Sequence, residues 1–534
     1  MPSITKQTVG NHTYLYESHS FRDEEGRPRN KKIKIGKIDP HTGMARYTEE
    51  YIERMRIKGT PVSIVQTNVL DDLEGRIERA MNSLRDYGTF YFLKNIAEKA
   101  GILSIVKEAA PSYWMELVML CFYLAASNRP LMYMEDWLEE NESYPVGKMS
   151  SPRISELLSA IGQKERNAFF EEWVKRNVSD EYMALDITSL SSYSNMMKDC
   201  EWGYNRDGEA LPQINLCLLF GERTGLPVYQ TSYCGSLRDV ATLRTTLAEM
   251  KAVSGGKRLV LVMDKGFYSE KNIQALLCEY GENEFLVTLP FTLELTRALV
   301  EQERHKIDCA ANIIRTSSSP IRGLSRQIDF AGHSLRAHIY FNPEKALSKR
   351  NDLYGRINYL KEKLEAGKVP SAFRKEAEKY LSVEKCGTKT EKPVVKIRQD
   401  IIDKELSTSH WMVIIGNGEM SAQAAYDIYC KKDVVEKAFM RYKNMLGMSR
   451  LRVHDDERAR NKNFAAFISL VLVSYIHKMM KKNSIYKKMT MEKLLLSMSK
   501  IKIIVINGRH IMRPLTKMQR EIFKAFSIPL PPVG

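Results

Sequence analysis

The stretch Arg258-Leu-Val-Leu-Val-Met-Asp264-Lys-Gly-Phe267 decides the fold class of this chain. A nearly continuous run of branched apolar residues is typical of a strand that is buried on both faces of a sheet. Asp264 follows the last apolar residue, so an acid stands at the carboxyl edge of the strand, where open α/β sheets bind their ligands. The stretch therefore predicts the central strand of an α/β sheet with a candidate functional residue at its end.

Further strand and helix patterns surround this stretch. Period-two alternation or apolar runs predict strands, and apolar residues at i, i+3 and i+4 predict helices. The strands fall at 182–188, 211–221, 226–233 and 284–289, and the helices at 239–253 and 271–280. The resulting order, β-β-β-α-β-α-β, fits a ribonuclease H-like sheet.

Outside this core the pattern changes several times. Alternation at 14–20 and 29–37 around a turn at Gly26 predicts a hairpin. Helical spacing follows at 71–84, 90–101, 112–126 and 152–178, and strands and charged helices between 291 and 405 interrupt the sheet before Trp411–Gly416 rejoins it. We predict an α/β ribonuclease H-like catalytic core interrupted by an α+β insertion, with an N-terminal β-hairpin module and an all-α domain. The predicted boundaries are 1–65 (basic β-rich module), 66–178 (all-α domain), 179–290 and 406–477 (core), 291–405 (insertion) and 478–534 (basic C-terminal region).

Composition narrows the class of partner. Lys and Arg outnumber Asp and Glu by 81 to 65, giving a net charge of +16, and such an excess favours nucleic acid over anionic membrane. The alternative is a basic surface that only keeps the protein soluble. The eight cysteines include no C-x2-C pair, which argues against a cysteine zinc site or a disulfide framework.

No segment predicts a membrane span or a signal peptide. The apolar runs 114–126 and 464–476 are shorter than the ~20 residues that cross a bilayer, and we expect both to be buried helices. The N-terminus lacks an apolar signal core, so we expect a cytoplasmic protein.

Three acids are candidate metal ligands. Asp186 lies inside an apolar strand pattern, where an unpaired carboxylate costs several kcal/mol. Asp264 ends the central strand, and Glu436 lies on the last predicted helix of the core. Three carboxylates suit hard Mg²⁺ or Mn²⁺, and two such ions ~4 Å apart can activate an attacking oxygen and stabilise a leaving one.

The helix that carries Glu436 has an unusual face. At ~100° per residue, Tyr429, Lys432, Glu436 and Lys443 fall within roughly 60° of one another. A carboxylate that needs a metal beside ammonium groups that need a phosphate suits DNA strand-transfer chemistry.

Each acid also has a purely structural interpretation. Asp186 could pair with a buried Lys or Arg, Asp264 could cap the following helix, and Glu436 could form an i, i+4 ion pair with Lys432. The common order, elements and helix face of the three favour a joint site.

These motifs resemble the DDE transposases of bacterial insertion sequences, in the IS-four superfamily with its Y-x2-R-x3-E-x6-K signature. The resemblance runs from Asp186 to about Leu472, and 1–180 match more loosely. Its further pieces are Gly203-Tyr-Asn-Arg-Asp-Gly208, Gly225-Leu-Pro-Val, Gly235-Ser-Leu-Arg-Asp239, Asp264-Lys-Gly-Phe and His454-Asp-Asp-Glu-Arg-Ala-Arg460. Lys432 stands where the family has Arg, which replaces a two-pronged guanidinium by a point charge. Gly235-Ser-Leu stands where the family tends to show Gly-Asn-Thr/Ser.

The resemblance implies metal-dependent cleavage of DNA at the ends of an insertion sequence, followed by strand transfer into target DNA. It makes Asp186, Asp264 and Glu436 the catalytic ligands of two Mg²⁺ ions, with Mn²⁺ as a substitute. The resemblance also implies that five basic or phenolic residues contact DNA, namely Tyr429, Lys432, Lys443, Lys265 and Arg441. The expected partners are double-stranded terminal repeats and target DNA, bound by a homodimer in the synaptic complex.

The chain must also hold DNA outside the site, and the candidates are 29–37, the helices of 71–178 and the basic 478–524. Two other functions stay open. A nuclease on the same sheet would use the acids and leave the Tyr/Lys face without a role. A catalytically inactive DNA-binding protein derived from a transposase would not need the acids.

Overall fold

The computed structural model describes most of the chain. The described residues are 3–10, 12–39, 45–59, 80–177, 181–254, 260–279, 283–366, 368, 371–384, 394–506 and 509–532.

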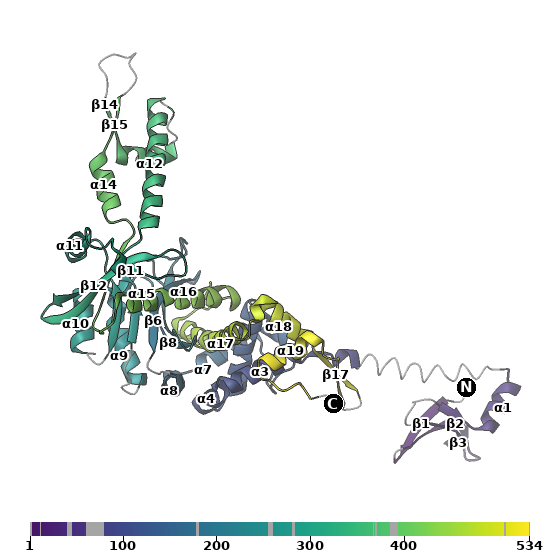
Figure 1. Ribbon diagram of the computed structural model, residues 1–534. Helices are drawn as coiled ribbons and strands as arrows, with labels where there is room; N and C mark the ends of the chain where they lie inside the picture. Colours follow the sequence, from purple (N-terminus) through teal and green to yellow (C-terminus); the bar gives the residue numbers. More distant parts are fainter. Residues whose placement is uncertain are drawn as a thin grey trace.

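A nine-stranded mixed sheet forms one side of the molecule, on the left in Figure 1. The strands β6, β9 and β10 run parallel, and their other neighbours are antiparallel. The spatial order is β11 (Ile313–Ile314), β12 (Ile321–Phe330), β13 (His333–Phe341), β16 (Trp411–Gly416), β10 (Glu284–Thr288), β9 (Val260–Met263), β6 (Tyr182–Ser191), β7 (Gln213–Gly221) and β8 (Pro227–Cys234).

The predicted order of elements in the first part of the core is confirmed. Helix α9 (Asp239–Ser254) follows β8, and α10 (Glu270–Cys278) connects β9 to β10. This mixed α/β sheet is consistent with a ribonuclease H-like core.

The predicted insertion is too long at its N-terminal side. Strands β11 to β13 belong to the large sheet, because β13 pairs with β16 from Arg336↔Gly416 to Phe341↔Trp411. Both faces of β13 are covered, since Ala337 and Ile339 pack into the main core and Tyr340 packs under helix α15 (Ala422–Lys431). A hairpin pattern identifies two strands but not the sheet that they join.

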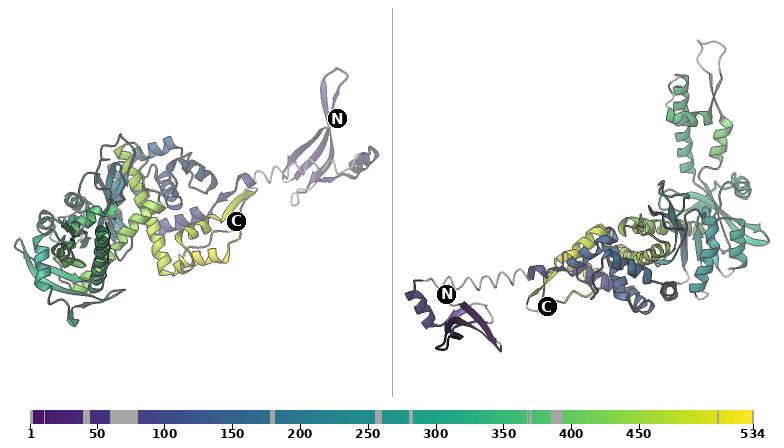
Figure 2. Two further views of the ribbon diagram at one scale, coloured as in Figure 1. Left: turned by 90° about the horizontal axis from the view of Figure 1, so that it is seen from above. Right: turned by 180° about the vertical axis from the view of Figure 1, so that it is seen from behind.

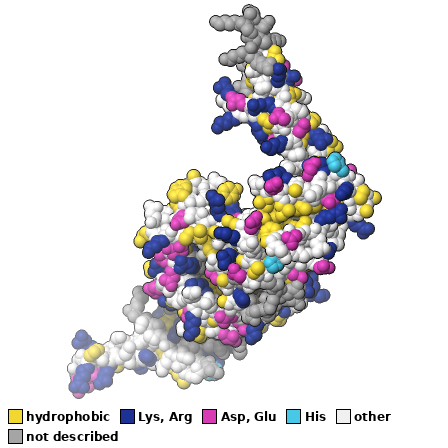
Figure 3. Space-filling model, turned by 90° about the vertical axis from the view of Figure 1, so that its left-hand side faces the viewer, with side chains coloured by type: hydrophobic (Ala, Val, Ile, Leu, Met, Phe, Trp, Pro, Cys, Tyr) yellow, Lys and Arg dark blue, Asp and Glu magenta, His cyan; other side chains and the backbone are white. Residues whose placement is uncertain are grey.

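The described residues between 343 and 407 leave the sheet as a projecting arm (Figure 1). Its own small core includes Leu353, Ile357 and Tyr380, and many Lys and Arg side chains cover the side seen in Figure 3. Residues 385–393 of the predicted lysine-rich stretch 385–397 lie outside the described residues. The elements of the arm are α12 (Pro343–Glu365), α13 (Arg374–Tyr380), β14 (Leu381–Glu384), β15 (Val394–Ile397) and α14 (Gln399–Ser407).

Different helices cover the two faces of the sheet. Ala422 and Ala425 of α15 pack on Val262 and Leu286. On the opposite face, the side chains of α9 and α10 join the main core, together with those of β9 and β10 that alternate with Val262 and Leu286. Helix α11 (Glu294–Glu303) follows β10.

A helical layer beside the sheet is built from two distant chain segments. Phe523 of α19 contacts Tyr91 and Phe92 of α3, and β17 pairs with β5. The C-terminal region, which we predicted as a separate basic segment, therefore packs on the helices after residue 85. The predicted helix 71–84 falls mainly on 71–79, outside the described residues. The layer contains α3 (Gly88–Lys99), α4 (Ile102–Ala109), α5 (Trp114–Ala126), α6 (Met134–Glu140), α7 (Ser151–Ala160), α8 (Gln163–Asn177), α17 (Asp456–Lys482), α18 (Met491–Ser499) and α19 (Lys517–Ala525), with the short sheet β5 (Arg85–Asp86), β17 (Lys502–Ile506) and β18 (Arg509–Met512).

Helix α17 is the one described helix that is long and apolar enough to cross a membrane by length and composition. Its apolar window is 78% buried inside the protein, where it packs against α5, α7 and β8. Both apolar runs of the sequence are thus buried helices, as predicted.

The N-terminal residues form a small module that lies apart from the rest of the described chain (Figure 2). The predicted hairpin is present as β2 (His12–Arg22) and β3 (Pro28–Ile38), and Gly26 has a φ of 76° in the turn. The module also contains three elements that no sequence pattern predicted, which are β1 (Ser3–Val9), β4 (Ala45–Tyr47) and helix α1 (Glu49–Ile57).

Candidate active site

The two strand acids lie side by side at one edge of the sheet. Leu185 of β6 pairs with Met263 of β9, and Asp186 and Asp264 are the next residues on the two parallel strands. Their side chains lie on the sheet face that α15 covers, because both alternate with residues of the main core. Asp264 does not cap the following turn, since its carboxylate accepts no capping hydrogen bond.

Glu436 reaches the same place from a third element. It lies in the first turn of α16 (Asp433–Met440), which contacts β6. The three acids therefore come from two strands and a helix that are far apart in the sequence, and all three lie around Lys432.

The ammonium group of Lys432 stands among the three carboxylates. Its Nζ lies 3.8 Å from Asp186 Oδ2, 3.7 Å from Asp264 Oδ2 and 3.6 Å from Glu436 Oε1. Lys432 is only 5% exposed, and its Nζ has no hydrogen-bond partner among the described residues. Asp186 and Glu436 thus both form an ion pair, as their structural interpretations predict, and their partner is the same lysine.

A second group of contacts holds Asp264. Tyr429 donates its hydroxyl to Asp264 Oδ1 at 2.9 Å, and Thr288 at the end of β10 donates to the same oxygen at 3.4 Å. Burial, together with the negative charge of Asp264, raises the pKa of Tyr429 above its ordinary value, so the phenol keeps its proton. Two neutral donors thus orient this carboxylate.

Asp186 is the least exposed of the acids. Burial raises its pKa to about 6, while the Lys432 charge and a hydrogen bond from the Ile187 amide oppose the rise. With all four groups ionised, the three acids and one lysine carry a formal charge of −2.

The donor set fits a divalent cation in chemistry and charge. Carboxylate oxygens are preferred ligands of Mg²⁺ and Mn²⁺, and an excess of negative charge around a buried cation favours further positive charge. Within the described ranges, no three His, Cys, Asp or Glu side chains lie close enough together to hold one ion as they stand. At the candidate site the ammonium group of Lys432 stands among the acids.

A family comparison bears on this geometry. The model of the family described as Transposase DDE domain matches residues 180–472, which is more than half of the chain and contains all three acids. The chain belongs to this family.

No curated protein matches the chain. A solved structure, the synaptic complex of piggyBac transposase with hairpin DNA, is similar over 72% of this chain and 69% of that chain, with 10% identity and a TM-score of 0.38. Membership of the DDE family supports a transposase function.

The predicted helix 429–443 of the DDE domain is not regular. Its first part, α15, ends at Lys431, and a tight turn follows at Lys432, where the amide of Lys432 bonds to Tyr429 and the amide of Val435 bonds to Lys432. The chain then continues as α16 and as the π-helix η6 (Arg441–Met445). A constant 100° per residue does not hold across such breaks. The turn leaves Lys432 between the acids.

The remaining predicted DNA contacts lie in three different places. Lys443 pairs with Asp207 of the β6–β7 connection at 2.6 Å, and Lys265 is exposed directly after Asp264. Arg441 lies near Tyr486 and His477, on the side of η6 that meets the helical layer, and the burial of its side chain lowers its pKa. The structure thus brings Tyr429 and Lys432 to the acids, and places Lys443, Lys265 and Arg441 around or behind them.

Sequence reasoning missed two residues of this region. Thr288 is the last residue of β10, the strand next to β9. A polar residue at the end of a strand beside Asp264 was the signal that could have identified it. Asp207 belongs to the motif 203–208. The first residue of this motif must be a glycine, because a Cβ on Gly203 would lie 2.0 Å from the Gly235 carbonyl oxygen. The two motif glycines therefore let the β6–β7 and β8–α9 connections meet.

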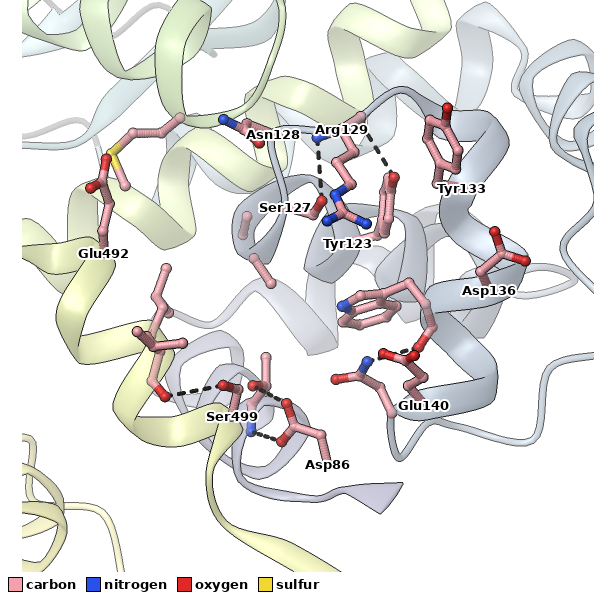
Figure 4. A pocket seen from close by; sticks show the side chains of 18 of the residues that line it. Asp86, Tyr123, Ser127, Asn128, Arg129, Tyr133, Asp136, Glu140, Glu492 and Ser499 are labelled. Carbon is pink, nitrogen blue, oxygen red and sulfur yellow. Dashed lines mark hydrogen bonds between the residues drawn. The ribbon is translucent and has the colours of Figure 1, made fainter. Parts of the chain in front are cut away.

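A cavity of about 650 Å³ is lined in part by Asn444 and Met445 of η6 (Figure 4). Asp86, Asp136, Glu140 and Glu492 surround it, and none of the three candidate ligands lines it. The candidate site of the DDE domain is instead an open edge, since Glu436 and Asp264 are 61% and 45% exposed.

Proposed function

We propose that this chain is a DDE transposase that cuts DNA at the ends of an insertion sequence and joins the freed 3′-hydroxyl to target DNA. The observation that carries the proposal is the meeting of Asp186, Asp264 and Glu436 around one buried cation. An isolated structural ion pair needs one acid, whereas three acids from separate elements suit a site that binds added positive charge.

In this proposal the three acids would hold two Mg²⁺ ions, or Mn²⁺, as the IS-four resemblance implies. Bound ions would supply the charge that activates an attacking oxygen and stabilises a leaving one. Tyr429 fixes the orientation of Asp264 by its hydrogen bond. Lys432, once displaced from the acids, is placed to bind a DNA phosphate, and Lys443 is held nearby through Asp207.

The proposal includes two copies of the chain acting on paired DNA ends, as the IS-four resemblance implies. It also keeps the division into a core, an arm, a helical part and an N-terminal module as functional units. A nuclease with the same acids is the second candidate, and only joining separates it from a transposase.

The experiment uses a labelled duplex that carries the end of the element, an unlabelled target plasmid and Mg²⁺. We expect wild type to cut the duplex and to join its 3′-end to the plasmid, and Asp264→Asn to do neither while it still binds the duplex. Cutting without joining would favour the nuclease. Equal cutting by wild type and Asp264→Asn would refute the assigned site.

A further inference from the structure

The N-terminal module has one covered and one open sheet face. Its strands follow the order β1-β2-β3-β4. Helix α1 covers one face, where Leu15, Ile35 and Tyr51 form the buried core. The other face, here called the outer face, is not covered by any element of the described module.

The strand registers define the side chains of the outer face. Leu15 points to the core, so its neighbours Tyr14 and Tyr16 point outward with their partners Lys37 and Lys34. A bulge at Ile35 keeps this residue in the core without changing the sides of the lysines. The Lys34 Nζ lies 3.8 Å from the centre of the Tyr14 ring, which places both on one face.

Polar side chains complete the outer face on either side of the tyrosines. In the strand register, Ser18 of β2 lies opposite Lys32 of β3. On the other side of β2, Thr5 and Gln7 of β1 lie opposite Tyr16 and Tyr14. Ser18 is 5% exposed and donates its hydroxyl to Asn30. The outer face thus combines three exposed lysines with the exposed amide of Gln7 and the half-buried hydroxyls of Tyr14 and Tyr16.

The strands place no acid on the outer face, although Lys6 and Lys31 lie on the helix side and Asp39, the residue after β3, pairs with Arg46 opposite Lys37. The only acid in the four strands is Glu17, which is 4% exposed on the helix side and pairs with Arg54 of α1. No described carboxylate pairs with Lys32, Lys34 or Lys37. The three lysines are therefore free to meet an anion.

The chemistry of the outer face fits a DNA duplex. Lysines neutralise phosphates along the duplex, and hydroxyl and amide groups can form hydrogen bonds with phosphate oxygens. We propose that the outer face of β1–β3 binds double-stranded DNA, with Lys32, Lys34 and Lys37 at the phosphates. The choice of DNA as the partner rests on the proposed transposase function.

The test compares two full-length variants with the same loss of charge. The face variant carries Lys32→Gln, Lys34→Gln and Lys37→Gln. The matched control carries Arg27→Gln, Arg56→Gln and Lys58→Gln, which are exposed positions of the turn and of the α1 region. Affinity for the fluorescent end duplex is measured by anisotropy at several salt concentrations.

We expect the face variant to bind at least tenfold more weakly at 150 mM salt. Its slope of log affinity against log salt should fall by about 2 to 3, since each phosphate contact contributes about 0.9. The control should keep its affinity within threefold. Equal losses in both variants would overturn the proposal.

A second measurement does not depend on any variant. Bound duplex should protect Lys32, Lys34 and Lys37 of wild type from acetylation, measured by mass spectrometry, while Lys58 stays reactive. Unprotected face lysines would contradict the proposal. Failure of the proposed transposase function is distinguishable, because wild type would then not cut the duplex although the face lysines are still protected.

Discussion

At the scale of single residues, Lys432 is the centre of the site. It is a buried ammonium group that is shared by three carboxylates and has no hydrogen bond among the described residues. Removing one partner of a buried charge cluster is costly, because the remaining charges lose their compensation.

We predict that Lys432→Gln lowers the melting temperature of the metal-free protein and enlarges the stabilisation by Mn²⁺. The cost should be about 1–3 kcal/mol, below that of a fully buried pair, because Asp264 and Glu436 are partly exposed. Thermal melts with and without Mn²⁺ measure both effects. Lys431→Gln is the control, since Lys431 pairs with Glu222 away from the acids; an equal Mn²⁺ shift in both variants would contradict the prediction.

At the scale of elements, the strand β13 shows how the extension of the sheet is stabilised. His338 is fully buried on this strand, with its Nδ1 2.8 Å from Ser325 Oγ and its Nε2 without a partner among the described residues. Burial lowers the pKa of His338 to about 4, and the nearby Arg336 contributes.

We predict that this histidine makes the protein less stable in acid. A folded-state pKa below the unfolded value of ~6.5 means that the full stability is present above pH ~6.5 and is lost as the pH falls towards 4. The loss should reach about 2–3 kcal/mol, because each pKa unit corresponds to ~1.4 kcal/mol. Urea unfolding of wild type and His338→Gln at pH 7.5 and 4.5 should show a smaller acid loss in the variant. The exposed His454→Gln should behave as wild type, and an equal loss in all three would show that another group is responsible.

The elements also show how much the sequence can predict. Strands β6 to β10 follow from local apolar patterns, and the acids at their ends follow from position on a strand. The pairing of β13 with β16 joins residues about 75 apart in the chain, and no local pattern encodes such a partner. The turn at Lys432 was missed for a different reason: Tyr429 to Lys443 has regular helical spacing, and the break arises where α15 and α16 pack on different parts of the structure.

At the scale of the whole molecule, the chain closes on itself through the helical layer. Phe523 of α19 is fully buried against Tyr91 and Phe92 of α3, more than 400 residues away along the chain. The basic composition of 478–524 concealed this packing, because the lysines lie on exposed positions between the buried ones.

We predict that Phe523→Ala loosens both ends of the layer together. The cost should be about 3–5 kcal/mol for a large buried ring. Hydrogen exchange should speed up in α3 as well as in α19. Met518→Ala, an exposed position on the same helix, should leave both helices protected; faster exchange confined to α19 would argue against joint folding.

The most direct test of the central claim compares cleavage of the end duplex by three proteins in Mg²⁺. The proteins are wild type, Glu436→Gln and Asp433→Asn, whose exposed acid lies three residues earlier and pairs with Lys437. The account predicts that Glu436→Gln loses at least a thousandfold in cleavage rate at unchanged DNA affinity, while Asp433→Asn stays within threefold of wild type. Wild-type cleavage by Glu436→Gln would show that the three acids around Lys432 are not the catalytic site.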